Sequence, residues 1–182
     1  MPEASYSQLV ARAQRGDPQA LGALYDDHHE ALFRYFWSKV GSRELAEDLT
    51  ADVFLRMLSA LPRYHDTGAP FRAWLYGIAR YRLVDHYRKE GQRDFVGLEH
   101  AEALDQSGPN DPLMLTEHRL SMERLQQALA RLSEPQREVV TLRFLSGLSL
   151  LEVAQVLNKS EQAVKALQHR GLAALRLELA RE

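Results

Sequence analysis

The stretch Leu148-Ser149-Leu150-Leu151-Glu152-Val153-Ala154-Gln155-Val156-Leu157-Asn158-Lys159-Ser160 decides how the last part of the chain folds. Its apolar residues recur at helical spacing up to Leu157, and a second periodic segment runs from Ser160 to Leu179, so the pattern predicts two helices. Asn158 suits the left-handed backbone of a tight turn, and Ser160 suits the N-cap of the second helix. The small side chain of Ala154 stands where the two helices must approach closely.

Two helices joined in this way form a helix-turn-helix. Val153, Val164 and Leu167 supply the apolar contacts that hold the helices at a steep angle. The second helix of such a motif presents polar side chains that reach base edges and phosphates in a major groove. The candidate DNA contacts here are Ser160, Gln162, Lys165, Gln168, His169 and Arg170. Lys165 is the strongest of them, because the geometry of the motif leaves it few other roles.

The rest of the chain also has helical periodicity, and no run of β-branched residues alternates strictly, so we expect an all-α fold. Asp17 is a suitable N-cap for a helix that begins at Pro18, and Pro62 ends a later one. The helices that the pattern predicts upstream of residue 148 cover residues 5–15, 18–40, 42–61, 69–89, 116–132 and 135–146.

An acidic linker divides this all-α chain into two small helical domains. Residues 94–117 contain six acidic residues and no Lys or Arg, and Gln106-Ser107-Gly108-Pro109-Asn110-Asp111-Pro112 is rich in turn formers. We therefore predict a helical domain over 1–93, a flexible acidic linker over 94–117, and a helix-turn-helix domain over 118–182.

The net charge of −2 hides an uneven distribution. Residues 71–93 contain six basic and two acidic side chains, a local +4, and residues 158–182 contain five basic and three acidic ones, a local +2. Nucleic acid responds to such local fields rather than to the total charge. The last part of each predicted helical domain is therefore suited to binding a phosphate backbone.

The predicted helix over 69–89 mixes aromatic residues with arginines. Residues at core-facing helical spacing are Phe71, Trp74, Leu75, Ile78 and Leu83. The spacing favours a core position less strongly for Tyr76 and Tyr87. For Trp74 a core position and a DNA-facing position both stay open, with the core favoured, and for Tyr81 the two are evenly balanced.

Several other functions find no support. The chain has no cysteine, no apolar run long enough for a membrane span and no features of a secretory signal, which favours a cytoplasmic protein. The cluster Asp26-Asp27-His28-His29-Glu30 does not converge, because adjacent helical residues point about 100° apart. We expect no metal and no other cofactor, and neither a nucleophilic serine motif nor a phosphate-binding loop occurs.

Three segments in order resemble the extracytoplasmic-function (ECF) sigma factors of the bacterial sigma-70 family. The first runs from Ala46 to Arg56 and is similar to the helix that binds the β′ clamp of RNA polymerase. The second, Phe71 to Arg88, is similar to the helix that melts and reads the −10 element. The third, Leu132 to Ser149, leads into the helix-turn-helix that reads the −35 element.

The resemblance implies a protein without a reaction of its own, which binds core RNA polymerase through the β′ clamp and β flap and directs initiation at specific promoters. It also implies that a basic, aromatic surface of the protein holds single-stranded promoter DNA together with an unstacked base of the non-template strand. The residues it assigns to −10 recognition and melting are Tyr64, Trp74, Arg80, Tyr81 and Arg88. Those it assigns to the polymerase contact are Asp48, Asp52, Leu55 and Arg56, although the spacing of the two aspartates alone indicates only a solvated face. An anti-sigma factor is an expected partner, and the acidic linker is expected to follow the RNA path of the polymerase.

The sequence departs from the family at three places. Tyr81 stands where many members have Asn, which leaves the identity of the captured base open. Leu167-Gln168 replaces a frequent Arg-Leu, and Leu172 replaces a frequent Arg, so the −35 contact is expected to be electrostatically weaker. Two other classes are alternatives: a stand-alone regulator with the same helix-turn-helix, and a helical enzyme with a DNA-binding tail. The regulator does not explain the basic, aromatic N-terminal domain, and no catalytic constellation supports the enzyme.

Overall fold

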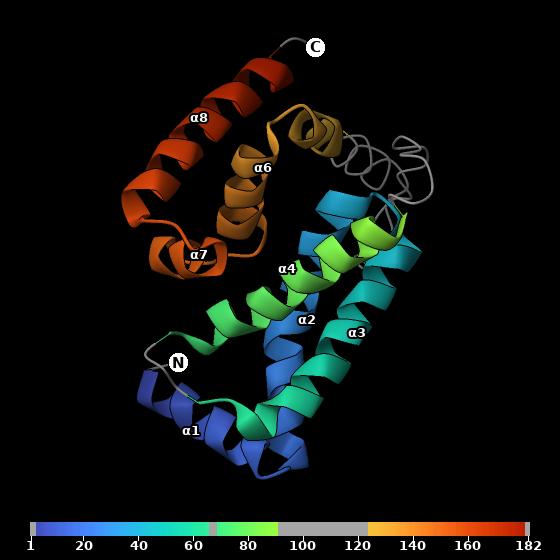
Figure 1. Ribbon diagram of the computed structural model, residues 1–182, viewed down its shortest axis with the longest axis vertical. Coiled ribbons are helices and arrows are strands. Elements are labelled where there is room, and N and C mark those ends of the chain that lie inside the picture. Colours follow the sequence, from blue (N-terminus) through green and yellow to red (C-terminus); the bar gives the residue numbers. More distant parts are fainter. Residues whose placement is uncertain (1–2, 66–68, 91–123, 181–182) are drawn as a thin grey trace, which may run out of the picture.

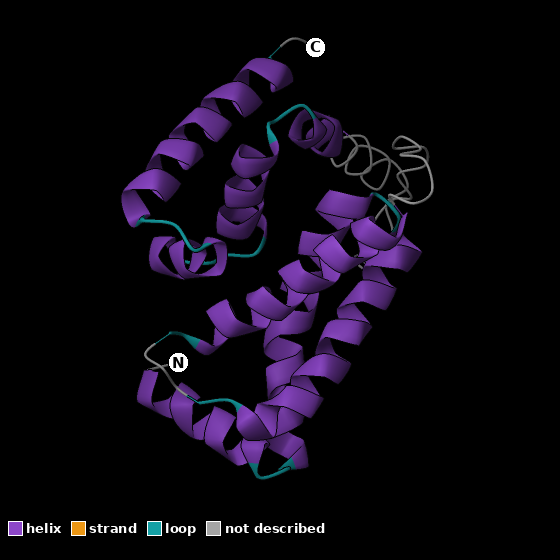
Figure 2. Ribbon diagram, in the orientation of Figure 1, coloured by secondary structure: helices purple, strands orange, loops and turns teal. Residues whose placement is uncertain are grey.

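The computed structural model describes residues 3–65, 69–90 and 124–180, and within these ranges all regular structure is helical, as the sequence predicts. Figures 1 and 2 show a group of N-terminal helices with a smaller group of C-terminal helices lying against it. The predicted acidic linker over 94–117 and the start of the predicted helix over 116–132 lie outside the described residues.

The N-terminal group consists of α1 (Glu3–Gln14), α2 (Pro18–Val40), α3 (Arg43–Ala60), a short 3₁₀ turn η1 (Leu61–Arg63) and α4 (Phe71–Glu90). Helix α2 has the predicted bounds, and the Asp17 side chain accepts hydrogen bonds from the backbone N–H groups of Gln19 and Ala20. It ends at Gly41, whose left-handed backbone (φ 73°) suits a residue without a Cβ. Ser42 then caps α3 by accepting from the N–H of Leu45.

The C-terminal group consists of helical residues 124–130, α6 (Glu134–Val140), the π-helical turn η2 (Thr141–Leu145), α7 (Leu150–Leu157) and α8 (Glu161–Leu179). The sequence predicted one helix over 135–146, whereas the structure ends α6 at Val140 and continues in a wider turn. In that turn the N–H of Ser146 donates to the carbonyl of Thr141, five residues back, at 3.0 Å. A wider turn of this kind re-aims the chain before α7.

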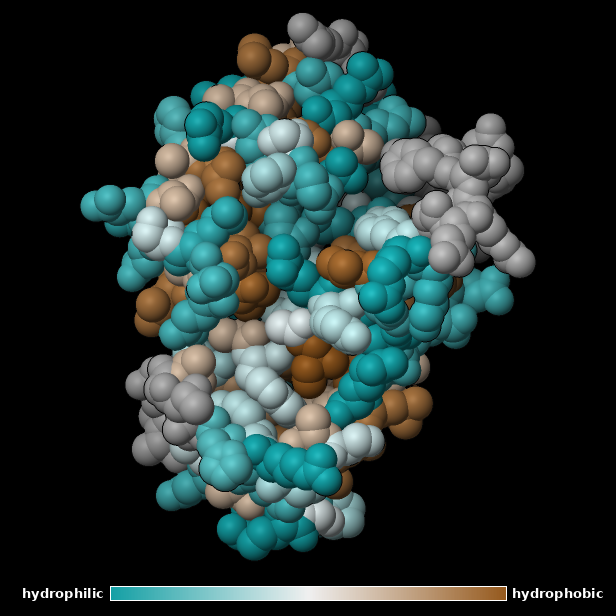
Figure 3. Space-filling view, in the orientation of Figure 1, coloured by the Kyte–Doolittle hydropathy of each residue, from teal (hydrophilic) through white to brown (hydrophobic). Residues whose placement is uncertain are grey.

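One apolar core joins the two groups. Trp37, Tyr35 and Leu75 from the N-terminal helices are 2% exposed or less and belong to the same buried cluster as Val139 and Val153 from the C-terminal ones. A smaller cluster under α8 is formed by Leu129, Leu132 and Val140. Figure 3 shows hydrophobic residues in scattered groups among hydrophilic ones on one face of the molecule. The sequence predicted both helical parts but not the contact between them.

Candidate nucleic-acid interface

The helix-turn-helix of α7 and α8 is built as the sequence predicts. Ser149 caps α7 by accepting from the N–H of Glu152 at 3.2 Å, and the Glu152 carboxylate accepts from the N–H of Ser149 in return. Asn158 adopts the left-handed conformation (φ 50°, ψ 51°), and Ser160 caps α8 through the N–H of Ala163. Val153 and Val164 are fully buried between the helices. These contacts fix the direction in which α8 leaves the turn.

One side of α8 is free to meet a ligand. Gln162, Lys165, His169 and Arg170 are all exposed, as is the capping residue Ser160. Gln168 differs from the expectation, because it is half-buried and its Oε1 accepts from Nε of Arg143 at 3.1 Å. A side chain held in this way has less freedom to turn toward a base.

The start of α4 packs against the loop before it. Tyr64, Phe71 and Trp74 form an aromatic cluster, with ring centroids 4.7 Å apart for Tyr64 and Trp74 and 5.3 Å apart for Phe71 and Trp74. Phe71 is buried, whereas Tyr64 and Trp74 are half-buried. Both interpretations of Trp74 therefore have a physical basis, because its ring packs against Tyr64 and Phe71 while the residue stays partly accessible.

Further along α4, Tyr81 stands out because its ring is 62% exposed. Arg80 and Arg88 are also exposed, and Arg88 donates to Oδ1 of Asp85 at 2.8 Å. Tyr76 differs from the expectation, because it is only 1% exposed and meets the ring of Tyr35 edge-on. Burial also raises the pKa of the Tyr76 hydroxyl to about 12.

The four residues assigned to the polymerase contact lie on α3, but not all of them are free. Asp48 and Arg56 are exposed, and Leu55 is 63% exposed, which is unusual for so large an apolar side chain. Asp52 is half-buried and pairs with Arg82 of α4 as well as with Arg56. Asp52 therefore ties α3 to α4, and Leu55 is the more accessible feature of this face.

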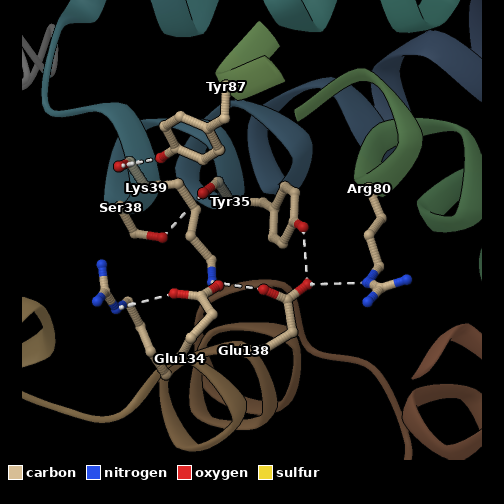
Figure 4. Close-up of polar contacts among 8 residues, drawn as sticks. Tyr35, Ser38, Lys39, Arg80, Tyr87, Glu134 and Glu138 are labelled. Carbon is tan, nitrogen blue, oxygen red and sulfur yellow. Dashed lines mark hydrogen bonds and ion pairs between the residues drawn. The ribbon is translucent and has the colours of Figure 1, made fainter. Parts of the chain in front are cut away.

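The contact between the two helical groups contains charged residues that sequence reasoning missed (Figure 4). The ammonium of Lys39 on α2 pairs with the carboxylate of Glu138 on α6, and it lies 3.1 Å from Glu134. The Tyr35 hydroxyl donates to the same Glu138 at 2.9 Å, and Nε of Arg80 lies 4.0 Å from it. Lys39 and Glu138 are 99 residues apart in the chain, so no local pattern points to the pair.

A second polar link joins α4 to the turn before α7. Arg72 donates to the carbonyl of Ser146 at 2.8 Å, and its Nε lies 3.9 Å from Glu152. Gln126 donates to the carbonyl of Trp37 at 3.2 Å. Both acceptors are backbone carbonyls near the end of a helix or turn, and the Trp37 carbonyl also accepts from the N–H of Gly41 at 3.0 Å.

The histidine cluster near residue 28 has a structural role. His28 is 5% exposed, and its Nε2 shares a hydrogen bond with the Tyr6 hydroxyl of α1. Burial, aided by nearby Arg72, lowers the pKa of His28 to about 4, so its ring is neutral at pH 7. His29 stacks on Tyr25 instead, with centroids 4.9 Å apart. Within residues 3–65, 69–90 and 124–180, no group of three potential ligands is placed to hold a metal ion.

Two family models match the chain, and they define its class. Residues 24–93 match sigma-70 region 2 and residues 122–175 match sigma-70 region 4, so both helical groups have a counterpart in bacterial sigma factors. The chain is 40% identical over 172 residues to the ECF RNA polymerase sigma factor BldN of Streptomyces coelicolor. That alignment covers 92% of this chain and 63% of the relative, which is longer.

Shorter relatives match over most of their own length. The chain is 37% identical over 178 residues to the ECF sigma factor ShbA of Streptomyces griseus, covering 92% of each chain. It belongs to the ECF sigma factors of the sigma-70 family and is an RNA polymerase sigma factor. This confirms the resemblance drawn from the three sequence segments. Members of the family are specificity subunits that bind core RNA polymerase and direct transcription initiation.

Solved structures show the same fold. The structure of CnrH in complex with the cytosolic domain of CnrY matches with a TM-score of 0.74 and 29% identity, covering 96% of each chain. The sigma factor RpoE of Bartonella quintana, solved with the anti-sigma factor NepR, matches with a TM-score of 0.67 and 24% identity, covering 84% of this chain and 91% of that one. Among the described residues, no helix combines the length and apolar character that crossing a membrane requires.

Proposed function

We propose that this sigma factor divides promoter recognition between two surfaces. The exposed residues of α8 read the −35 duplex, and α4 with the loop before it opens and holds the −10 element. The observation that supports this division is that exposed polar or aromatic side chains occur on both helices. Gln162, Lys165 and Arg170 are accessible on α8, and Arg80 and Tyr81 are accessible on α4.

The −35 contact rests on Lys165, with Ser160, Gln162, His169 and Arg170 beside it and Gln168 held further back by Arg143. If Lys165 contacts a base, replacing it by Ala is expected to weaken binding of a −35 duplex by about 1–3 kcal/mol. If Lys165 contacts a phosphate, the slope of the logarithm of the binding constant against the logarithm of the salt concentration is expected to fall in magnitude by about one. Arg176→Ala, an exposed cation on the last turn of the same helix, is the control. Unchanged affinity and salt slope for Lys165→Ala would exclude Lys165 from the contact.

The −10 contact rests on Tyr81, together with Trp74, Arg80 and Arg88 elsewhere on α4 and Tyr64 in the loop before it. Stacking of a base on an aromatic ring contributes about 1–3 kcal/mol, which is comparable with the cost of opening one base-pair step. Tyr81→Ala is expected to impair transcription from a duplex promoter more than from a pre-melted one, whereas Tyr81→Phe keeps the stacking surface and most of the activity. An equal loss on both templates would reject the melting role.

The polymerase contact is assigned to the face of α3 that carries Asp48, Leu55 and Arg56, with Asp52 holding this face against α4 through Arg82. We further propose that the protein has no catalytic site of its own and acts in the cytoplasm, where the polymerase and the promoter are. An anti-sigma factor is a proposed partner, since RpoE of Bartonella quintana was solved with one. The domain limits 1–93, 94–117 and 118–182 are part of this proposal.

One assay tests the whole assignment. Run-off transcription with purified core polymerase and a promoter library must give initiation that depends on this protein. Binding to duplex DNA without initiation would instead favour a stand-alone regulator.

A further inference from the structure

The Glu138 carboxylate lies in a site made by the N-terminal helices. Tyr35 donates to it at 2.9 Å, Lys39 pairs with it, and Arg80 lies 4.0 Å away. Figure 4 shows these three side chains converging on Glu138 from α2 and α4. Two cations and one hydroxyl donor therefore surround a single anion that comes from the other helical group.

Lys39 shows how closely the site is covered. Its side chain is 1% exposed, and its partners Glu138 and Glu134 both belong to α6. Leaving an ammonium buried without its anion is strongly unfavourable. When α6 moves away, Lys39 becomes accessible and needs water or another anion.

The donors in this site suit a phosphate as well as a carboxylate. Arginine, lysine and hydroxyl groups form charge-assisted hydrogen bonds with both kinds of oxygen. The site also adjoins the surface proposed above to hold promoter DNA, because Arg80 belongs to both and precedes the exposed Tyr81.

We propose that Tyr35, Lys39 and Arg80 form an anion site that Glu138 fills in the closed chain and that a promoter phosphate fills when α6 moves away. Glu138 is then an intramolecular competitor of DNA. This inference rests on the proposed role of α4.

The energetics of the contact suit a switch. A buried ion pair gives little net stability, because desolvation of the two charges offsets most of their attraction. The other polar links across the contact are few: Arg72 donates to the carbonyl of Ser146 and lies 3.9 Å from Glu152, and Gln126 donates to the carbonyl of Trp37. Breaking the contact exposes apolar surface, but the freed carboxylate and ammonium regain hydration or a phosphate partner.

The first test measures opening in the free full-length chain. Because the sequence has no cysteine, Glu44→Cys and Gln155→Cys, both exposed, can carry a pair of distance labels without further changes. Glu138→Gln keeps an acceptor for Tyr35 but loses the charge, and is expected to lengthen the distance between the labels. Glu30→Gln removes an exposed carboxylate from α2 that pairs only with neighbouring Arg34 among the contacts described, and should leave the distance unchanged.

The second test measures DNA binding by the same proteins with a fluorescent oligothymidylate, since phosphate contacts do not depend on sequence. Glu138→Gln is expected to bind at least about fivefold more tightly than the parent, because the competitor has lost its charge. Adding Lys39→Met to it should reduce the affinity and lower the salt slope by about 0.7, the value for one phosphate on a single strand. Adding Arg80→Gln to Glu138→Gln instead should also reduce the affinity and the salt slope, and because Arg80 is exposed this variant is not expected to misfold.

The outcomes separate the two halves of the idea. If Glu138→Gln changes neither distance nor affinity, Glu138 is not a competitor and the proposal is overturned. If the chain opens but Lys39→Met and Arg80→Gln leave affinity and salt slope unchanged, the site does not hold phosphate. If no variant binds the strand although the labels report opening, the proposed role of α4 has failed and the phosphate contact fails with it.

Discussion

The corner between α7 and α8 and the contact between α2 and α6 are built in opposite ways. The corner is formed by residues close together in sequence, with Ser149, Asn158 and Ser160 each fixing the adjacent backbone. The contact joins Lys39 to Glu138 across 99 residues and is buried. The corner sets the direction of α8, whose exposed side chains are proposed above to contact DNA, whereas the contact covers charged groups.

This difference has an energetic side. A cap or a turn residue contributes about 1 kcal/mol, because it satisfies one or two backbone groups. Contacts between distant helices bury side chains and are sensitive to the loss or gain of a few atoms. We therefore expect the local signals to determine where helices begin and end, and the distant contacts to determine most of the stability.

The largest effect is expected where α6 and α8 cross. Gly171 is buried, and a Cβ added there would lie 2.8 Å from Cγ2 of Val140 and 3.4 Å from the carbonyl of Gln136. Gly171→Val is therefore expected to lower the free energy of unfolding by about 3 kcal/mol, the upper end of the usual cost of overpacking. Denaturant titration followed by circular dichroism measures this loss.

Gly22→Val is the matched control for that variant. Gly22 also lies within a helix, but an added Cβ would meet nothing within 4 Å. Its stability should change by less than about 0.5 kcal/mol. Equal losses at the two glycines would show that the close approach of α6 to α8 is not the cause of the loss, since helix propensity alone favours Val over Gly.

The second effect concerns His28, which joins α2 to α1 through Tyr6. Its pKa is about 4 in the folded chain and 6.5 in the unfolded one, so the unfolded chain binds more protons between these values. Stability contributed by the neutral ring is present above pH 6.5 and is lost as the pH falls toward 4. Between pH 7 and pH 5 the loss is expected to be about 2 kcal/mol.

Unfolding titrations at the two pH values measure this difference. His28→Gln should flatten the pH dependence by that amount, whereas the same substitution at the exposed His169 serves as the control. A pH dependence that survives in His28→Gln would assign it to other groups and weaken the case for the contact between α1 and α2.

Most of the fold was predictable from the sequence, because its signals are local. Asp17 with Pro18, Ser42 and Asn158 mark helix limits that the structure reproduces within one or two residues. The π turn after Val140 was not predictable, since its residues have the same apolar periodicity as a helix. The turn contacts α2, which is distant in sequence and which no local pattern indicates.

In the candidate site, too, features set by local sequence were predictable and features set by distant contacts were not. Exposed polar residues of α8 could be chosen because a helix-turn-helix has a known outer face, and Lys165 lies on it. Tyr76 could not be placed, because its burial depends on Tyr35 from another helix. Gln168 was predicted as an outward residue, but Arg143, 25 residues away, holds it back.

The smallest effect is expected at the corner itself, and it tests the local half of the comparison. Asn158 is the only non-glycine residue with positive φ among the described ranges, and its N–H still donates to the carbonyls of Ala154 and Gln155. Asn158→Ala places a Cβ in the left-handed region without the local hydrogen bonding of Asn, and should cost about 1 kcal/mol. Asn158→Gly relieves this strain and should stay within about 0.5 kcal/mol of the parent, since greater freedom of the unfolded chain offsets part of the gain. If Asn158→Ala destabilised the chain more than Gly171→Val did, the turn rather than the distant packing would be the main source of stability in this part of the molecule.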